Sequence, residues 1–370
     1  MTNTIEFRRT SATPLPAAER EAILANPGFG NHFTDHMVSI VWTKEGGWEQ
    51  PELLPYGPIQ LDPAASVLHY GQEIFEGLKA YRRADGSVSA FRVEANAARL
   101  NASARRLALP ELPVELFVSA IDELVSTDAD WVAEGAEASL YLRPFMIADE
   151  SFLGVRAAHR ARFMVIASPA GPYFAQGVKP VSIWLAKGSS RAGHGGTGEA
   201  KCGGNYASSL LPQEEAAANG CAQVLFLDSS TEDTIEELGG MNLFLVKNGD
   251  TLVTPALNGN ILHGITRDSL IQLAKDRGLA VEERAVTVSE WQAGVADGTI
   301  TEAFACGTAA VITPIGRLLG ADGLDVNFGE NAPGPLTMSL RDELTGIQTG
   351  RVADTHSWVR EIVPAKAAVS

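Results

Sequence analysis

The sequence has few cysteines and no excess of basic residues. Its 370 residues include three cysteines, Cys202, Cys221 and Cys306, and no Cys-x-x-Cys pair. An odd, widely spaced set indicates reduced thiols, not a disulfide framework, a zinc site or a redox couple. Lysine and arginine number 29 against 45 aspartate and glutamate, a formal net charge of −16. This balance argues against a nucleic-acid or anionic-membrane partner, because binding a polyphosphate surface requires a basic face.

Long apolar runs are also missing. The most apolar segment, residues 140–148, is interrupted by Arg143 and falls short of the roughly 18 residues that a membrane span needs. Near the N-terminus Glu6, Arg8 and Arg9 have no apolar run behind them, so no export signal is expected. We therefore expect a cytoplasmic protein with no membrane partner.

The length and the pattern of apolar residues predict two domains. A chain of 370 residues exceeds what one core usually fills. We expect a first domain over residues 1–168, a linker rich in proline and glycine over 169–177 and a second domain over 178–370. β-rich runs and helical periodicities occur in both halves without strict alternation, which predicts an α+β fold with a ligand in the interdomain cleft. The expected strands cover residues 37–42, 88–93, 139–148, 162–167, 181–186, 222–228, 241–246 and 281–287. The expected helices cover residues 93–107, 114–132, 206–219, 266–278, 289–296 and 335–350.

Two familiar patterns are weak in this sequence. Residues 193–198 fit Gly-x-Gly-x-x-Gly, but the expected strand ends near Ala186 and no helix follows directly, so a mobile or cofactor-covering loop is favoured over a dinucleotide site. His32 and His36 have the spacing of a zinc-binding helix, yet the glutamate that would serve as the base is missing. No metal site is expected.

Three other segments each have a functional and a structural interpretation. Lys201 stands between glycine-bearing segments; it is either a solvated loop lysine or, if desolvated, a lysine able to form a Schiff base. Gly264 and Thr266 open a predicted helix whose free amides suit a phosphate, although Thr266 also fits a plain N-cap. Residues 306–310 expose main-chain amides or form a simple turn.

Together with several longer motifs in the same order, these segments make the sequence resemble the branched-chain aminotransferases, which are fold-type IV pyridoxal-phosphate enzymes. The resemblance extends from about Phe29 to Arg317. Its motifs are residues 29–37 (FGNHFTDHM), 69–81 (HYGQEIFEGLKAY), 96–100 (NAARL), 140–144 (LYLRP), 201–206 (KCGGNY) and 236–242 (EELGGMN). It implies a two-domain fold-type IV architecture with pyridoxal 5'-phosphate as the cofactor.

The resemblance also implies roles for individual residues. Lys201 is the catalytic residue, which carries the cofactor and moves the proton between the α-carbon of the amino acid and C4′ of the cofactor. Glu237 faces the pyridine nitrogen, so that the protonated ring can accept electrons. Tyr206 donates a hydrogen bond to the phenolic oxygen. The phosphate group is bound by Arg99, Ile265, Thr266 and Thr308.

By the same resemblance, an apolar pocket receives the branched side chain and a second copy of the chain completes it. The pocket walls are Phe29, Phe75, Tyr141 and Tyr173. Its floor is formed by Gly240 and Ala310, and Thr308 and Ala309 are two further substrate-binding residues. Tyr70, Leu153 and Val155 reach in from the partner of a homodimer. Arg143 balances the γ-carboxylate of glutamate in the second half-reaction, or else forms a structural ion pair.

The expected reaction is reversible transfer of the amino group between L-leucine, L-isoleucine or L-valine and 2-oxoglutarate. Within the same fold, the alternatives are a D-amino acid aminotransferase and an aminodeoxychorismate lyase; residues 73–79 and 141–143 favour the branched-chain type. A non-catalytic ligand-binding relative is the alternative of a different class, and the presence of Lys201, Tyr206 and Glu237 argues against it. Gly240 stands where a threonine is often found, which leaves the substrate preference open.

Overall fold

The computed structural model describes residues 5–135, 137–173, 177–329 and 332–365, and the chain divides into two compact units. Unit 1 consists of Met1–Tyr173, Ala200–Gly203 and Gly346–Ser370, and unit 2 of Phe174–Glu199 and Gly204–Thr345. Each unit combines a mixed sheet with helices, which confirms the predicted α+β class. Within the ranges just given, none of the helices has the length and hydropathy that crossing a bilayer demands.

These units differ from the sequence-based division into residues 1–168 and 178–370. The segment around Lys201 belongs to unit 1, because Phe75 donates its main-chain N–H to the carbonyl oxygen of Lys201 (2.9 Å). The C-terminal residues also return to unit 1, since β19 (Val359–Val363) pairs with β7 (Val88–Phe91). The predicted linker begins inside β9 (Arg160–Ala170), and its residues 174–176 lie outside the described part of the chain.

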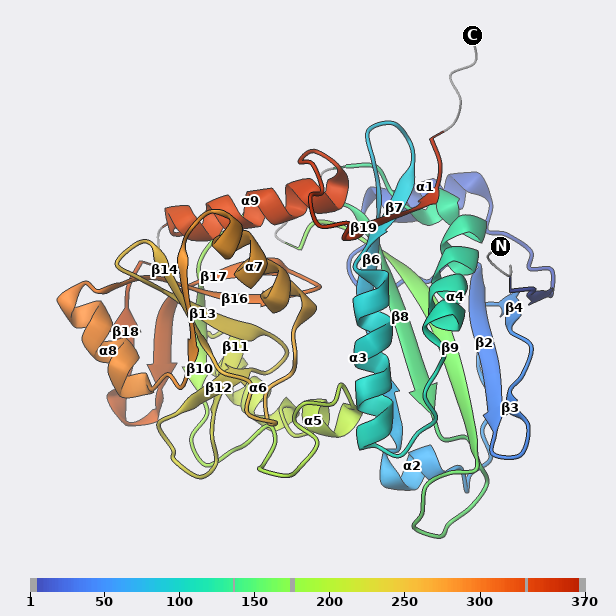
Figure 1. Ribbon diagram of the computed structural model, residues 1–370, viewed down its shortest axis with the longest axis horizontal. Helices are drawn as coiled ribbons and strands as arrows, with labels where there is room; N and C mark the ends of the chain where they lie inside the picture. The colour runs from blue at the N-terminus through green and yellow to red at the C-terminus, as the bar shows by residue number, and fades with distance from the viewer. Residues whose placement is uncertain (1–4, 136, 174–176, 330–331, 366–370) are drawn as a thin grey trace. The chain divides into compact units, whose positions relative to one another are not determined.

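The sheet of unit 1 has ten strands among the described residues, in the order β1-β4-β2-β9-β8-β6-β7-β19, with β3 beside β2 and β5 beside β8 (Figure 1). Its long central pair is the antiparallel β8–β9, in which Tyr141 lies opposite Ser168. The strands not yet given bounds are β1 (Arg8–Arg9), β2 (His36–Thr43), β3 (Gly47–Trp48), β4 (Glu52–Pro55), β5 (Glu73–Phe75), β6 (Leu78–Arg82) and β8 (Ser139–Ile147).

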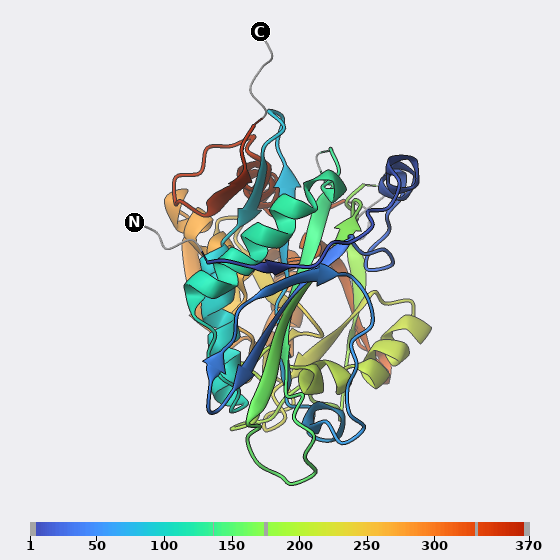
Figure 2. The same cartoon turned by 90° about the vertical axis from the view of Figure 1, so that its right-hand side faces the viewer.

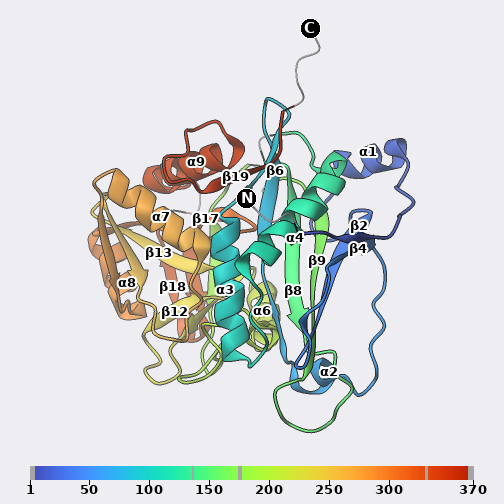
Figure 3. The ribbon, with the colours of Figure 1, turned by 45° about the vertical axis from the view of Figure 1, so that its right-hand side comes forward.

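Two amphipathic helices pack on this sheet. α3 (Val93–Arg106), expected over residues 93–107, buries an apolar stripe of Val93, Ala97, Leu100 and Ala104. α4 (Val114–Thr127) lies across β2 and β9, as Figures 2 and 3 show. α4 ends five residues earlier than the sequence predicts and is followed by the 3₁₀ turn Ala129–Trp131. The remaining helices of unit 1 are α1 (Ala17–Ala25) and α2 (Ser66–Tyr70).

The sheet of unit 2 has nine strands among the described residues, in the order β12-β11-β10-β17-β16-β13-β14-β15, with β18 beside β17. β10 is parallel to both β11 and β17, so the carboxyl ends of these three strands meet at one edge. The strands are β10 (Val181–Leu185), β11 (Gln223–Leu227), β12 (Ile235–Leu238), β13 (Asn242–Lys247), β14 (Thr251–Pro255), β15 (Ala280–Arg284), β16 (Ile300–Gly307), β17 (Val311–Gly320) and β18 (Asp325–Asn327).

The helices after β10 are α5 (Gly203–Ala207), α6 (Leu210–Ala218), α7 (Ile265–Asp276), α8 (Val288–Asp297) and α9 (Pro335–Thr349), with a 3₁₀ turn at Ala321–Gly323. The single helix predicted over residues 206–219 is thus two shorter ones. α8 shows clear end signals: Thr287 accepts a hydrogen bond from the N–H of Glu290 (3.0 Å), and Gly298 ends the helix in a left-handed conformation.

Candidate active site

The main chain of Lys201 is held on both sides by unit 1. Its N–H donates to Ser103 Oγ (2.9 Å) on α3, and its carbonyl oxygen accepts from Phe75 on β5. Two residues further, the N–H of Gly203 donates to the carboxylate of Glu73. A Cβ atom at Gly203 would overlap that carboxylate, so a larger residue there would require the Glu73 side chain to move. The segment is therefore fixed in place, and the lysine on it is half-buried.

Around this lysine lie four of the residues that the sequence predicts for substrate binding. Nζ of Lys201 is 4.9 Å from the centroid of the Phe75 ring, and the guanidinium carbon of Arg143 is 4.8 Å from the same centroid. Two cations on one aromatic ring form a favourable place for a carboxylate. We call Phe29, Phe75, Tyr141, Arg143 and Lys201 the lysine cluster.

Tyr141 connects the aromatic and the charged members of the lysine cluster. Its hydroxyl accepts a hydrogen bond from Arg143 Nη2 (3.0 Å), and its ring meets that of Phe29 edge-on at 5.0 Å. Gly77 lies directly beside the hydroxyl, where a Cβ atom would overlap it. The arrangement presents an apolar wall next to a cation whose position depends on a tyrosine hydroxyl.

Arg99 is buried beside a carboxylate. It was predicted to bind the phosphate group; its side chain is only 9% exposed and forms an ion pair with Glu76, which is 0% exposed. Arg99 Nε donates to Glu76 Oε1 and Nη2 donates to Oε2, both at 2.8 Å. Two parallel bonds of this kind are the geometry in which a guanidinium binds a carboxylate most strongly.

In unit 2, Glu237 is a carboxylate buried in the sheet. It lies on β12, is 3% exposed, and accepts the N–H of Leu262 at Oε1 (2.9 Å). Asn242 Nδ2 points to its Oε2 at 3.5 Å, and Arg191 forms an ion pair with it. We call Arg191, Glu237, Asn242 and Leu262 the carboxylate cluster.

The first turn of α7 lies close to the carboxylate cluster. Asn242, whose amide points to Glu237, also donates to the carbonyl oxygen of Leu262 (3.0 Å) and contacts Gly264, where a Cβ atom would overlap its Oδ1. Ile265 and Thr266 follow Gly264 and begin the helix, so their N–H groups have no acceptor within it. This end suits an anion, as the sequence predicts.

The predicted pocket floor is also in unit 2. A Cβ atom on Gly240 would lie 3.8 Å from the ring of Tyr206, and one on Gly307 would lie 3.5 Å from the carbonyl oxygen of Gly240. Thr308, Ala309 and Ala310 form the turn between β16 and β17, and Val311 after them has a φ of 61°. A β-branched residue rarely adopts this left-handed conformation, and such strain is typical of functional turns.

The residues predicted to reach into a partner's pocket gather on one exposed part of unit 1. Tyr70 is 44% exposed, Leu153 60% and Val155 85%, and the Tyr70 hydroxyl donates to the carbonyl oxygen of Leu153. Leu68 on α2 and Phe152, next to Leu153 in the sequence, are also exposed apolar side chains. Tyr173, which is 47% exposed, follows Gly171, whose N–H donates to the carbonyl oxygen of Gly28 (3.2 Å) beside Phe29.

Sequence reasoning missed the polar residues that support these groups. Glu73 and Glu76 stand within a recognised motif but received no role, and Arg191 was not singled out at all. Neither composition nor periodicity reveals a buried ion pair, because the pattern of apolar residues carries no information about charged partners. His36, considered above as a metal ligand, bonds through Nδ1 to Asp128 Oδ1 (2.7 Å). In the part of the chain that the structure describes, no three His, Cys, Asp or Glu side chains are grouped to hold a metal.

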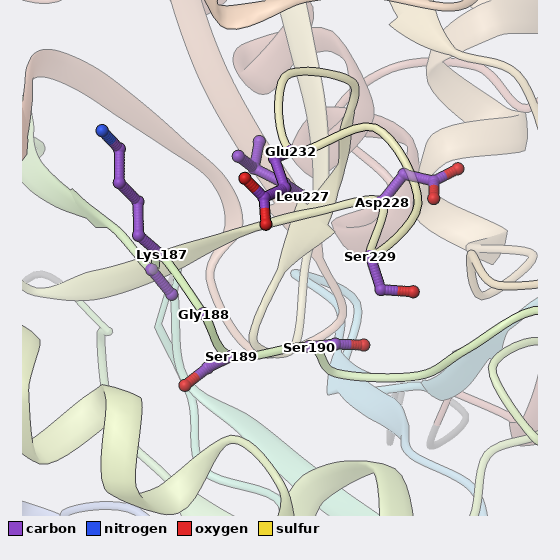
Figure 4. Close-up of a pocket in the computed structure, with 9 residues that line it drawn as sticks. Lys187, Gly188, Ser189, Ser190, Leu227, Asp228, Ser229 and Glu232 are labelled. Atoms are coloured by element: carbon purple, nitrogen blue, oxygen red, sulfur yellow. The ribbon is translucent and has the colours of Figure 1, made fainter.

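A separate hollow of 340 Å³ lies at the carboxyl ends of β10 and β11 in unit 2 (Figure 4). Residues 186–190 and 227–229, with Glu232, line it. Figure 4 shows the Lys187 side chain directed away from Asp228. Asp228 instead accepts hydrogen bonds from Ser230 (2.6 Å from its Oγ) and pairs with His194 (3.2 Å), and these contacts, those from Ser230 first, hold its pKa below the ordinary value. None of the predicted site residues lines this hollow.

Comparisons with known proteins agree with the resemblance seen in the motifs. A family model described as amino-transferase class IV matches residues 73–318. The branched-chain-amino-acid aminotransferase of Mycolicibacterium smegmatis is 58% identical over 97% of this chain and 98% of its own length. A probable branched-chain-amino-acid aminotransferase of Streptomyces coelicolor is also 58% identical, over 98% of this chain and 99% of its own.

Solved structures show the same relationship. The branched-chain amino acid aminotransferase of Escherichia coli superimposes with a TM-score of 0.72 at 27% identity, covering 87% of this chain and 99% of the other. The branched-chain aminotransferase of Thermoproteus uzoniensis with norvaline also gives a TM-score of 0.72 at 27% identity, with the same coverage of 87% and 99%. The enzyme from Thermobaculum terrenum in its pyridoxal-phosphate form gives 0.71 at 26% identity, covering 88% and 98%.

Proposed function

This chain belongs to the class IV aminotransferases, within them to the branched-chain amino acid aminotransferases, and from that premise we propose how its residues act. The proposed reaction transfers the amino group between L-leucine, L-isoleucine or L-valine and 2-oxoglutarate. The observation that carries the proposal is the lysine cluster, in which Lys201 and Arg143 both lie against the ring of Phe75. This cluster combines an amine, a cation for a carboxylate and an apolar wall.

The cofactor is pyridoxal 5'-phosphate, and several residues present fit its groups. When bound, it supplies an aldehyde that condenses with amino groups and a ring that accepts electrons from the α-carbon. The buried carboxylate of Glu237 suits a protonated ring nitrogen, because a carboxylate accepts a strong, charge-assisted hydrogen bond from a cationic N–H. The amides of Ile265 and Thr266 suit a phosphate, as does the guanidinium of Arg99. Tyr206, for the phenolic oxygen, and Thr308, for the phosphate, complete the proposed cofactor-binding residues.

The amine of Lys201 takes the proton from the α-carbon of the substrate and would deliver it to C4′ of the cofactor. Its main chain is fixed by Ser103 and Phe75. Only the flexible side chain therefore moves when the amine carries the proton. General base catalysis by a positioned amine is typically worth about 10²- to 10⁴-fold in rate.

The substrate side chain packs against Phe29, Phe75 and Tyr141, with Tyr173 as a further wall, residues 240 and 310 as the floor and residues 308 and 309 as further contacts. When glutamate replaces the branched substrate, its γ-carboxylate is balanced by Arg143. Arg143 donates a hydrogen bond to the Tyr141 hydroxyl. This bond polarises the hydroxyl, which becomes a stronger donor to a carboxylate, while the guanidinium stays away from the apolar side chains.

The active form is proposed to be a homodimer. Leu68, Tyr70, Phe152, Leu153 and Val155 leave an exposed apolar patch on unit 1, and patches of this kind mark protein interfaces. The proposed location is the cytoplasm, which fits the three buried free cysteines.

Half-reactions of the cofactor-loaded protein test the proposal. L-leucine, L-isoleucine and L-valine should each convert the cofactor to its amine form in a single turnover, and 2-oxoglutarate should restore it. D-alanine should leave the spectrum unchanged. A response to D-alanine alone would favour a D-amino acid aminotransferase, pyruvate release from aminodeoxychorismate would favour the lyase, and no response to any amino donor would favour a non-catalytic relative.

Gly77→Ala tests the apolar wall. A methyl group at residue 77 overlaps the Tyr141 hydroxyl, so Tyr141 must move and its hydrogen bond with Arg143 is lost. We expect a loss of about 1–3 kcal/mol in stability from overpacking, together with a higher KM for both leucine and 2-oxoglutarate. Denaturant unfolding and steady-state kinetics measure the two effects. Gly57→Ala, where nothing lies within 4 Å of the added Cβ and φ is not positive, is the control that leaves both KM values unchanged.

A further inference from the structure

Arg191 is a buried arginine that the roles proposed so far do not use. It lies in the loop between β10 and α5, and its side chain is 4% exposed. Nη2 donates to the carbonyl oxygens of Gly198 (2.7 Å) and Asn260 (2.6 Å), and the same guanidinium forms an ion pair with Glu237. Its own carbonyl oxygen accepts from Ser208 Oγ (2.8 Å).

We propose that Arg191 is a positioning residue that keeps Glu237 ionised and aimed at the ring nitrogen of the cofactor. The inference deepens the proposed function and rests on it. An arginine remains charged at all relevant pH values, whereas an isolated buried carboxylate takes up a proton. A protonated Glu237 would no longer match a positively charged ring nitrogen.

The other groups described around Glu237 do not supply this charge. Cys306 on β16 is near enough for Glu237 to contribute to the pKa of its thiol, which burial raises well above the ordinary value, so it stays neutral. Arg267 on α7 is close enough for its charge to lower the pKa of Cys306. Its Nη2, however, donates to the carbonyl oxygen of Pro255 and to the carboxylate of Glu283 (both 3.0 Å), and not to Glu237. The other two members of the carboxylate cluster, Leu262 and Asn242, are uncharged donors.

Arg191 also joins Glu237 to the two segments that flank it in space. Gly198 lies three residues before Lys201, and Asn260 lies two residues before Leu262, which itself donates to Glu237. Gly198 packs so tightly that a Cβ atom there would overlap the main chain of Asn260. One guanidinium therefore holds both the Glu237 carboxylate and the loop that leads to the catalytic lysine.

The test measures the dissociation constant of pyridoxal 5'-phosphate between pH 6 and 9, by titrating the apo-protein and following the visible absorption band. For each variant, the constant is divided by that of the natural protein at the same pH, which removes the titration of the cofactor itself. For Arg191→Met we expect this ratio to rise as the pH falls, by up to about tenfold per pH unit once Glu237 protonates. Arg191→Gln, which conserves more of the polar contacts, should show the same slope, and it serves where the methionine variant folds poorly.

Three further variants isolate the charge on Glu237. Arg191→Lys keeps a cation and should give a ratio that is raised but nearly constant with pH. In the Glu237→Gln background, adding Arg191→Met should remove most of this pH dependence, because the carboxylate that pairs with Arg191 is gone. The neighbouring Glu236 keeps a pKa that burial raises and that the charge of Arg191 lowers, so this background measures its separate share. Arg317→Met, which breaks a surface ion pair with Asp325 in the same unit, should give a ratio near one.

A ratio for Arg191→Met and Arg191→Gln that is raised equally at every pH would overturn the inference and leave Arg191 a structural residue. The same holds if the full pH slope persists without the Glu237 carboxylate. Failure of the natural protein to bind pyridoxal 5'-phosphate would instead contradict the proposed function, so the two failures are distinguishable.

Discussion

Lys201→Ala is expected to bind pyridoxal 5'-phosphate without forming the covalent bond that gives the natural protein its visible absorption band. Transamination of L-leucine should fall by about 10²- to 10⁴-fold or more, since the general base is lost together with the covalent attachment. The effect should be local, because the main chain at residue 201 is held by Ser103 and Phe75, which the substitution does not touch. Absorption spectra and single-turnover rates provide the measurement.

Lys275→Ala is the matched control for this variant. Lys275 is an exposed lysine in the last turn of α7, and its replacement should leave both the absorption band and the rate unchanged. Thermal unfolding of both variants shows that they are folded. If Lys201→Ala retained the visible band and most of the rate, the assignment of the catalytic lysine would be wrong.

Much of the fold could be predicted from local patterns. The helices α3 and α4 follow directly from apolar residues at helical spacing, because each buries one stripe against a sheet. The strands β2, β8, β10 and β11 were recognisable as β-branched and aromatic runs. Both kinds of element carry their own signal, since the period of the apolar residues depends only on the local backbone.

Other central strands carry no such signal. β16 contains Ala303, Ala305, Cys306 and Gly307, and β17 has Pro314 in its middle, so neither resembles an isolated strand. β12 contains Glu236 and Glu237, and two buried acids contradict any apolar pattern. These strands form because they pair with neighbouring strands through main-chain hydrogen bonds, whatever their own side-chain pattern. The return of residues 346–370 to unit 1 is likewise a long-range pairing, between β19 and β7.

The predicted site divides in a similar way. The lysine cluster brings together Phe29, Phe75, Tyr141, Arg143 and Lys201, which the motifs predicted as a set. The residues that position the set were not predicted. Glu76 beside Arg99 and Arg191 beside Glu237 are charge pairs between segments far apart in sequence, and only the folded chain shows which charges meet.

Arg99→Met is expected to destabilise the protein by about 3–5 kcal/mol, because it leaves the carboxylate of Glu76 buried without its partner. It should also weaken binding of pyridoxal 5'-phosphate by about 10- to 100-fold, the equivalent of losing one hydrogen bond to a charged group. The free energy of unfolding, from denaturant titration, and the dissociation constant of the cofactor are measured separately. Arg105→Met, on the same helix but in an exposed pair with Glu111, should change neither quantity appreciably.

The double variant Arg99→Met, Glu76→Met separates the two roles of Arg99. Replacing both members of a buried ion pair by apolar side chains of similar size is often neutral, so most of the lost stability should return. The affinity for the cofactor should not return, because no guanidinium is left to bind the phosphate. If the double variant regained both, Arg99 would act only as the partner of Glu76, and the phosphate would have to be held by the amides of Ile265 and Thr266 and by Thr308.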